Sequence, residues 1–225
     1  MKKASAWFTE SDRKAIAEDI ARAESATTGE IVPVVATTSG NYDRAEDLFG
    51  LVFALISLSA LWLLRGVAPG GSGWPSGPAE SLSLPVVLSI VAVAFIAGAV
   101  LATVIPALRL PFIPRNEMER EVERRAAEAF HHFRIRSTAG ATGVLIYVSL
   151  FEHAVRVFGD DAINEKVDQK TWQEICDLVV DGIRKGEPAE GLSAGILRCG
   201  EVLARHFPID PGDKNELVNT LHLID

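Results

Sequence analysis

The chain has 225 residues, of which 48% are hydrophobic and 23% charged, and its formal net charge is -8. The hydrophobic content excludes an intrinsically disordered chain. The acidic balance argues against a nucleic-acid partner, since such binders carry a basic patch or stripe. The two cysteines, Cys176 and Cys199, are too few for a disulfide scaffold or a cysteine-based zinc site. We expect both to be small buried hydrophobic residues in a reducing compartment.

The first predicted elements are a helix and a strand. Thr9 followed by acidic residues is typical of a helix start, and apolar residues recur at helical spacing over 16–23. The helix should end near Thr27-Thr28-Gly29. Residues 30–38 (EIVPVVATT) are rich in β-branched types and predict a strand. Pro33 has no N–H, so we expect this strand at a sheet edge, or Pro33 facing outward.

Two apolar runs follow, Leu48–Leu64 and Val86–Ile105, and neither contains a charged residue. A membrane-spanning helix needs about 20 residues, with roughly 17 as the lower limit. Trp62 is well placed as an interfacial anchor. Two buried core helices are the alternative, but charge-free stretches of this length are rare in soluble domains. The runs, joined by a Gly- and Pro-rich loop over 65–85, predict a transmembrane hairpin over 48–106.

Charges beside the spans predict their orientation. The loop carries only Arg65 and Glu80, whereas arginines flank the spans on the other side. The positive-inside rule places those flanks in the cytoplasm. Met1-Lys2-Lys3 is basic, but Phe8-Thr9-Glu10-Ser11-Asp12 interrupts any apolar region, so no signal peptide is expected. We therefore expect a cytoplasmic soluble part with the loop outside. The flanking arginines are Arg44, Arg109, Arg115 and Arg120.

Small residues recur along both spans. Such faces let helices approach closely in lipid, either between two chains or within one hairpin. We favour packing of the hairpin's own two helices. The residues are Gly50, Ala54 and Ser57 in the first span and Ala94, Gly98 and Ala102 in the second.

The remaining residues predict a second part of the soluble domain. Asn116 with a glutamate three positions later resembles a capping box at the start of an amphipathic helix. Residues 143–150 are nearly continuously apolar and predict a central strand covered on both faces. A second strand is expected at 154–159. A strand, a helix and another strand favour parallel pairing, so the hairpin would interrupt the crossover between strands 30–38 and 143–150.

Two more helices complete the predicted domain. Apolar residues at helical spacing over 172–183 predict an amphipathic helix, with Gly186 suited to its C-terminal cap. A final helix over 192–203 should end at Phe207-Pro208. Residues 210–225 are polar and are expected to form a loosely held tail.

Three segments of the sequence resemble the TPM domain family of thylakoid-lumen, photosystem II repair and levamisole-receptor-modulator proteins. They are TTGEIVPVV, TGVLIYVSLFEHAVRVFGDDAI and GLSAGI…GEVLARHFP. The resemblance implies an α/β fold, in which a small mixed sheet is flanked by helices and interrupted here by the transmembrane hairpin. Its soluble parts would be residues 1–47 and 107–209. Bacterial members are often membrane proteins, which implies the bacterial inner membrane.

The resemblance leaves the activity open. Plant members are acid phosphatases, some bacterial members bind calcium or other divalent ions in acidic loops, and others are non-enzymatic assembly or modulator proteins. Where many members have Asp-Asn-Gly before the central strand, this chain has Ala141-Thr142-Gly143. We therefore expect a non-enzymatic interaction module with an unidentified protein partner. The alternative is a divalent-metal-dependent acid phosphatase.

Asp160 and Asp161 are the strongest candidate site residues. They end a predicted strand, where α/β sheets place ligands. With Glu165, and with Glu30 as a further candidate, they could offer hard oxygen ligands to calcium or magnesium. The competing interpretation, which we favour, is that they cap the helix beginning near Ala162 and interact with its dipole. No catalytic residue is assigned.

The other polar motifs give weaker signals. Adjacent histidines at 131–132 and a lone His153 lack the i, i+4 spacing of a metalloprotease. A loop with Arg134, Arg136, Ser137 and Thr138 could hold a phosphate through charge-assisted hydrogen bonds, although a solvated loop is the simpler interpretation.

Overall fold

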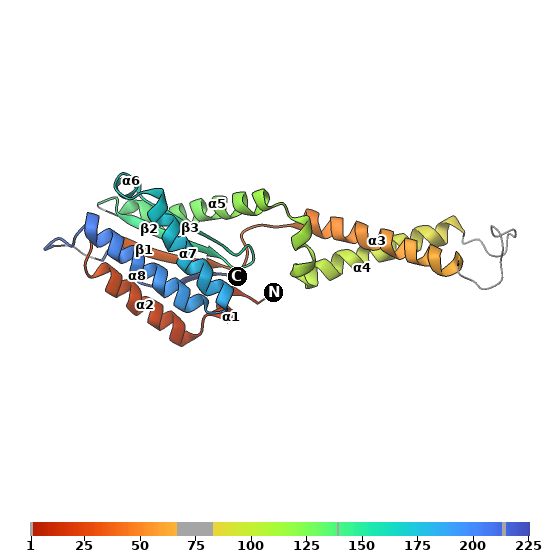
Figure 1. The fold of residues 1–225 in the computed structure, drawn as a ribbon, viewed down its shortest axis with the longest axis horizontal. Coiled ribbons are helices and arrows are strands. Elements are labelled where there is room, and N and C mark those ends of the chain that lie inside the picture. Colours follow the sequence, from red (N-terminus) through yellow and green to blue (C-terminus); the bar gives the residue numbers. More distant parts are fainter. Residues whose placement is uncertain (1, 67–82, 139, 213–214) are drawn as a thin grey trace. The chain divides into compact units, whose positions relative to one another are not determined.

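The computed structural model describes residues 2–66, 83–138, 140–212 and 215–225. These residues form two compact units, which we call the hairpin unit (residues 41–114) and the sheet unit (residues 2–40 and 115–225). The hairpin unit is therefore an insertion in the chain of the sheet unit (Figure 1). Most of the predicted loop over 65–85 lies outside the described residues. The predicted domain boundaries at 47/48 and 106/107 stay predictions.

The sheet unit has a mixed four-stranded sheet in the order β3-β2-β1-β4. Strand β1 is parallel to both β2 and β4, and β2 is antiparallel to β3. The predicted α/β class, with a mixed sheet and helices around it, is confirmed. The strands are β1 (Glu30–Ala36), β2 (Gly143–Ser149), β3 (Ala154–Gly159) and β4 (His222–Ile224). The helices are α1 (Ala4–Trp7), α2 (Glu10–Glu24), α5 (Arg115–His132), α6 (Asp161–Asn164), α7 (Gln169–Lys185) and α8 (Pro188–His206), with a 3-10 turn, η3, at Ile135–Ser137.

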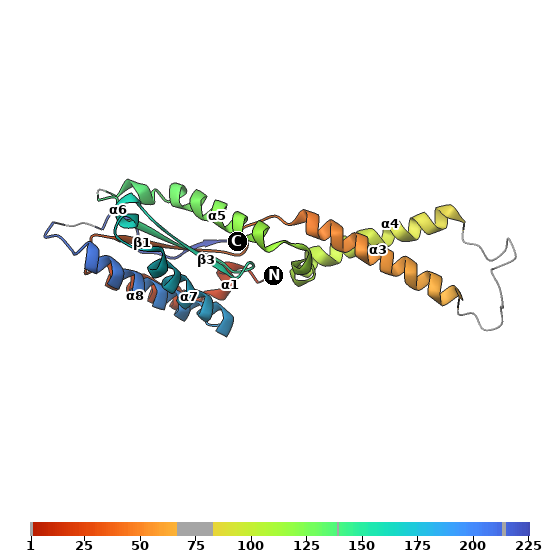
Figure 2. The same ribbon diagram turned by 45° about the horizontal axis from the view of Figure 1, so that its top comes forward.

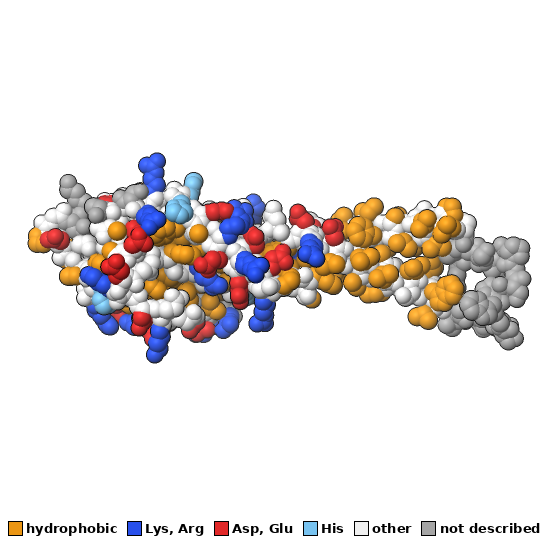
Figure 3. Space-filling view, turned by 90° about the horizontal axis from the view of Figure 1, so that it is seen from above, with side chains coloured by type: hydrophobic (Ala, Val, Ile, Leu, Met, Phe, Trp, Pro, Cys, Tyr) orange, Lys and Arg blue, Asp and Glu red, His pale blue; other side chains and the backbone are white. Residues whose placement is uncertain are grey.

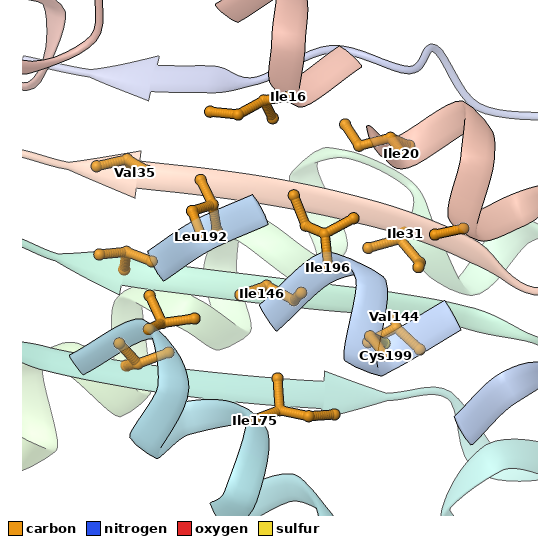
Figure 4. Packing of buried hydrophobic residues seen from close by; sticks show 14 of the residues in the cluster. Ile16, Ile20, Ile31, Val35, Val144, Ile146, Ile175, Leu192, Ile196 and Cys199 are labelled. Atoms are coloured by element: carbon orange, nitrogen blue, oxygen red, sulfur yellow. The ribbon is translucent and has the colours of Figure 1, made fainter. Parts of the chain in front are cut away.

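Helices cover both faces of the sheet (Figure 2). Because side chains alternate along a strand, successive residues of β1 and β2 enter different cores. Ile31 and Ile146 point to the side of α2, α7 and α8, where Ile196 packs among them (Figure 4). Val32 and Leu145 belong to the core on the side of α5. Every residue of β2 is buried, as predicted for a central strand.

Several helix ends follow local capping rules, whereas the N-caps of α1, α4 and α8 make no side-chain capping hydrogen bond. The Thr9 hydroxyl accepts the N–H of Asp12 at 3.2 Å, and Asp12 Oδ2 accepts the N–H of Thr9 at 2.8 Å, which makes a capping box. Gly186 ends α7 with φ 81°, in the left-handed region that glycine tolerates. The cap predicted at Asn116 is wrong: α5 begins directly after Pro114, so Asn116 lies inside its first turn.

Strand β1 is not an edge strand throughout its length. The last strand, β4, pairs with Val34–Ala36 and stops short of Pro33. On the same edge, the N–H of Ile31 donates to Glu24 Oε1 at 2.8 Å rather than to a strand. The nitrogen of Pro33 therefore falls beyond the ladder, and its missing N–H breaks no strand pairing.

The prediction of a loosely held tail is wrong for residues 215–225. The buried Glu30 carboxylate accepts the N–H groups of Glu216 at 2.9 Å and Leu217 at 3.3 Å. Leu221 is buried beside the core, and Asp225 accepts the N–H of Ser5 at 3.0 Å. Composition suggested a polar tail, but long-range partners that composition does not reveal hold it to the sheet unit.

The hairpin unit contains α3 (Asp43–Gly66) and α4 (Leu84–Val104), followed by the short 3-10 turns η1 (Pro106–Leu108) and η2 (Leu110–Phe112). Two segments are candidate membrane spans: Asp43–Leu64, of 22 residues, and Leu84–Val104, of 21 residues. Only 11% and 6% of their apolar windows are buried within the protein. Beyond the charged first turn of α3, hydrophobic side chains make up most of the visible surface of both helices (Figure 3).

The small residues of α3 and α4 pack against each other. A Cβ atom placed on Gly98 would lie 2.8 Å from Phe53 Cβ and 3.0 Å from Gly50 Cα. Ala54 and Ala102 are also buried. The small-residue faces thus meet within one hairpin, which agrees with the favoured interpretation.

An ion pair links the beginning of α3 to the segment after α4. Glu46 Oε1 pairs with Arg109 Nη1, and both side chains are largely buried. The hydroxyl of Thr103 donates to Glu46 Oε2 at 2.7 Å. The two ends of the hairpin are therefore joined near Glu46.

Candidate functional site

Polar side chains gather where the parallel strands β1 and β2 end. We call this group the serine–glutamate cluster: Ser39 follows β1, Tyr147 and Ser149 belong to β2, and Glu152 lies in the turn before β3. The carboxyl ends of parallel strands are the usual place for a site in an α/β fold. The cluster is therefore the first location to test for function.

Counting hydroxyl protons fixes the direction of the hydrogen bonds in the cluster. Ser149 donates its only hydroxyl proton to Glu152 Oε2. Ser39 lies 2.7 Å from the Ser149 oxygen and must therefore donate to it. Tyr147, whose oxygen is 3.1 Å from Ser39, must in turn donate to Ser39. The chain of hydroxyl groups thus ends on the Glu152 carboxylate.

Glu152 also binds the backbone that follows β1. Its Oε1 accepts the N–H of Ser39 at 2.9 Å and that of Gly40 at 3.2 Å. The hydroxyl of Thr38 lies 3.1 Å from the same oxygen. On the other side, Arg125 of α5 donates its Nε–H to the Ser39 carbonyl at 3.1 Å. The segment just before the hairpin unit is therefore fixed to the sheet unit.

Burial decides what this cluster can do chemically. Ser149 is 0% exposed, Tyr147 1% and Ser39 2%. Burial also raises the pKa of Tyr147, which keeps its hydroxyl protonated as a donor. No substrate can reach these hydroxyl groups, so we interpret the cluster as a structural clamp.

The predicted acidic pair lies at the end of β3. Asp160 is the N-cap of α6, and its Oδ1 accepts the N–H of Asp161 at 2.8 Å. It is only 2% exposed. Its second oxygen, Oδ2, has no hydrogen-bond partner among the described residues. Asp160 is thus both a cap, as the favoured interpretation predicted, and a buried carboxylate with one oxygen unused.

Arg136 binds this acidic pair. Its Nη2 lies 2.6 Å from Asp161 Oδ2, and its Nε lies 3.7 Å from Asp160 Oδ1. The hydrogen bond to Asp161 is the main reason that the pKa of Arg136 is raised. The sequence makes the loop with Arg136 a candidate phosphate site, but the structure pairs this guanidinium with carboxylates.

The other proposed metal ligands do not join the pair. Glu165 is the exposed C-cap of α6, and Glu30 binds the C-terminal segment instead. Within the described ranges, no group of three or more His, Cys, Asp or Glu residues is placed to hold a metal ion. Metal binding by Asp160, Asp161 and Glu165 stays a prediction.

The remaining polar and core residues named from the sequence lie at a helix end or in the hydrophobic core, as expected for structural roles. His131 and His132 lie in the last turn of α5, where cations suit the helix dipole. Trp172 and Cys199 are in the core, and burial raises the pKa of Cys199 above its usual value. Glu152 is not predicted as a site residue from the sequence. Its spacing of three from Ser149 across a turn was the only local signal, and its partner Ser39 lies on the far side of the hairpin insertion.

The protein therefore belongs to the α/β class: its domain has a mixed four-stranded sheet and is split in sequence by an inserted apolar hairpin. Residues 107–202 match the family model described as TPM domain, which covers most of the second part of the sheet unit together with the end of the hairpin unit. Among solved structures, it is similar to the NMR structure of the BA42 protein from the psychrophilic bacterium Bizionia argentinensis. The two share 21% identity over 99% of each chain with a TM-score of 0.57, a likeness of fold. No curated protein matches the sequence.

Proposed function

We propose that this protein is a membrane-anchored TPM domain that works in the cytoplasm by binding a protein partner rather than by catalysis. The observation that carries the proposal is the pair of long apolar helices, α3 and α4, which bury little of their surface within the protein. Exposed apolar surface of this extent is costly in water and suits a lipid environment.

The distribution of arginines supports a cytoplasmic sheet unit. Positively charged residues near the ends of short hairpins favour the cytoplasmic side. Arg44 lies near the start of α3, while Arg115 and Arg120 follow the hairpin at the start of α5. The predicted connecting loop carries Arg65 alone among arginines and lysines.

Partner binding is supported by the way polar groups are used in the sheet unit. The cluster at the strand ends is buried, and the acidic pair is bound to Arg136. Neither arrangement offers an accessible nucleophile beside a general base, which nucleophilic catalysis requires. A surface that recognises another protein needs no such arrangement.

A metal-dependent acid phosphatase is the second candidate. It is favoured by one observation, the buried Asp160 with an unpartnered oxygen at the end of a strand. In that reaction Asp160 and Asp161 would hold the divalent ion. The ion would polarise the phosphate and activate water.

The test uses the full-length protein in native membranes. The protein should resist alkaline carbonate extraction, and cross-linking should capture the same partner after α3 and α4 are replaced by an unrelated transmembrane hairpin. Capture no greater than with the unrelated hairpin alone would contradict partner binding. Phosphate-ester hydrolysis that depends on magnesium or calcium and is lost in Asp160→Asn would favour the phosphatase instead.

A further inference from the structure

The loop between α5 and β2 is held in a strained conformation beside the acidic pair. Arg134 and Ala141 have φ values of 54° and 49°, in the left-handed region that non-glycine residues seldom adopt. Thr142 fixes the loop by donating its hydroxyl to the carbonyl of Thr28 at 2.9 Å. The N–H of Asp160 donates to the carbonyl of Gly143 at 2.9 Å, so the acidic pair adjoins the end of this loop.

The acidic pair needs a cation nearby. A carboxylate removed from water is destabilised unless opposite charge or hydrogen bonds compensate it. Asp160 is 2% exposed and has one oxygen without a hydrogen-bond partner among the described residues. Asp161, next in the chain, adds a second negative charge. This unpartnered buried oxygen is an observation separate from the acidic sequence itself.

Arg136 supplies that cation from within the chain. Its guanidinium reaches both carboxylates while remaining 56% exposed, so it adds charge without filling the site. Arg136 lies in η3, which directly follows Arg134 with its φ of 54°, and its ion pairs place η3 beside the acidic pair at the end of β3. The strained backbone at Arg134 thus lies two residues from the ion pairs between Arg136 and the acidic pair.

The described residues do not fit a resident calcium or magnesium ion of the kind that the family resemblance implies. Calcium takes six to eight oxygen ligands. Here Asp160 Oδ1 already accepts a capping N–H, and Arg136 lies against both side chains. A divalent ion would have to displace the guanidinium or suffer its repulsion.

We propose that Arg136 is a built-in cation for the Asp160–Asp161 pair, and that removing its charge opens the pair to calcium. The tethered guanidinium competes at a high effective concentration, because the loop holds it beside the carboxylates. Without it, the buried carboxylate lacks a compensating charge, and a small hard cation becomes the favoured replacement.

Calcium titrations of full-length protein in detergent test this proposal. We expect the melting temperature of the wild type to be unchanged by calcium up to about 1 mM, the affinity range of weak protein sites. Arg136→Ala and Arg136→Gln should each gain a calcium-dependent rise of about 3 °C or more, as expected for a ligand well above its Kd. Arg136→Lys keeps the charge and should behave as the wild type does.

Two controls identify the site. Arg134→Asn removes a positive charge from the same loop, with a residue that tolerates positive φ, and should not create a calcium response. Adding Asp161→Asn to Arg136→Ala should abolish the calcium response, because it removes one of the two carboxylates. Asp161 is exposed and Asp160 is the N-cap of α6, so this change leaves the cap in place. Calcium stabilisation of the wild type would overturn the proposal. So would the lack of any gain in both the alanine and the glutamine variants.

Discussion

The N–H of Ser39 donates to Glu152 Oε1 at 2.9 Å, although the two residues are 113 positions apart in the chain. The inserted hairpin unit lies between them in sequence. Glu152 therefore fixes the segment leading to the hairpin to the turn between β2 and β3. The last backbone N–H groups of the sheet unit before the hairpin, those of Ser39 and Gly40, therefore have an acceptor within the sheet unit.

Glu152→Ala should be strongly destabilising. It leaves the N–H groups of Ser39 and Gly40 and the hydroxyl of Ser149 without their acceptor. Hydrogen bonds to charged groups contribute about 1.5–3 kcal/mol each, so we expect a loss of about 3 kcal/mol in the free energy of unfolding. Thermal and urea unfolding of the full-length protein measure it. Glu119→Ala, an exposed change on α5, should cost no more than about 0.5 kcal/mol. Equal effects of the two changes would contradict the clamp.

Replacing residues 48–105 with a glycine-serine linker should leave a folded sheet unit. Its cores are formed by its own strands and helices, and Ser39 is fixed on the near side of the insertion. Changing the loop length costs little, about 0.6 kcal/mol per doubling. Cooperative urea unfolding and dispersed amide resonances are the expected results. A molten or insoluble product would mean that the apolar helices contribute to the core.

Gly98→Val should disrupt the hairpin unit and spare the sheet unit. A branched side chain at this position would overlap Phe53 and the backbone of Gly50. Protease resistance of the hairpin in detergent should fall, while amide exchange of the buried strands β1 and β2 in the sheet unit stays unchanged. Ala97→Val, on the exposed side of the same helix, is the control. If both variants resist protease equally, the close approach at Gly98 is unimportant.

Acidification should loosen β4 through His222. Burial is the main cause that lowers the pKa of His222, and the nearby His132 lowers it further. The ring centroids of His222 and Phe133 lie 4.2 Å apart. Because the folded pKa is below the unfolded value of about 6.5, the neutral form favours folding. Its contribution is complete above that value and declines as pH falls through the folded pKa. Amide exchange of Leu223 and Ile224 should quicken over that interval, and His222→Phe should remove the effect. Exchange that is independent of pH after correction for the intrinsic rate would refute it.

Elements with strong local patterns could be predicted from the sequence. The continuous apolar run of β2, the helical spacing around Trp172 and Ile175 in α7, and Gly186 at its cap each express a local physical rule. Parallel pairing of β1 with β2 followed from the order of strand, helix and strand. These predictions required no knowledge of distant contacts.

Long-range partners explain what could not be predicted. The C-terminal strand depends on Glu30, a residue that looked available for metal and instead holds the N–H groups of residues 216–217. Likewise, Arg136 and Asp161 are 25 positions apart, and no local spacing connects them. The role of Glu152 could not be predicted either, because its carboxylate accepts hydrogen bonds only once folding brings the segment after β1 beside it.

The most direct test of the central claim, a cytoplasmic TPM domain anchored by a transmembrane hairpin, is cysteine labelling in intact cells. Both native cysteines are replaced, and single cysteines are introduced at Ser72, in the loop predicted from the sequence, and at exposed Glu201 in α8. A membrane-impermeant maleimide should label position 72 in intact cells and position 201 only after lysis. Labelling of position 201 in intact cells would contradict the cytoplasmic placement. Recovery of the protein in the soluble fraction, with neither position labelled in intact cells, would contradict membrane anchoring.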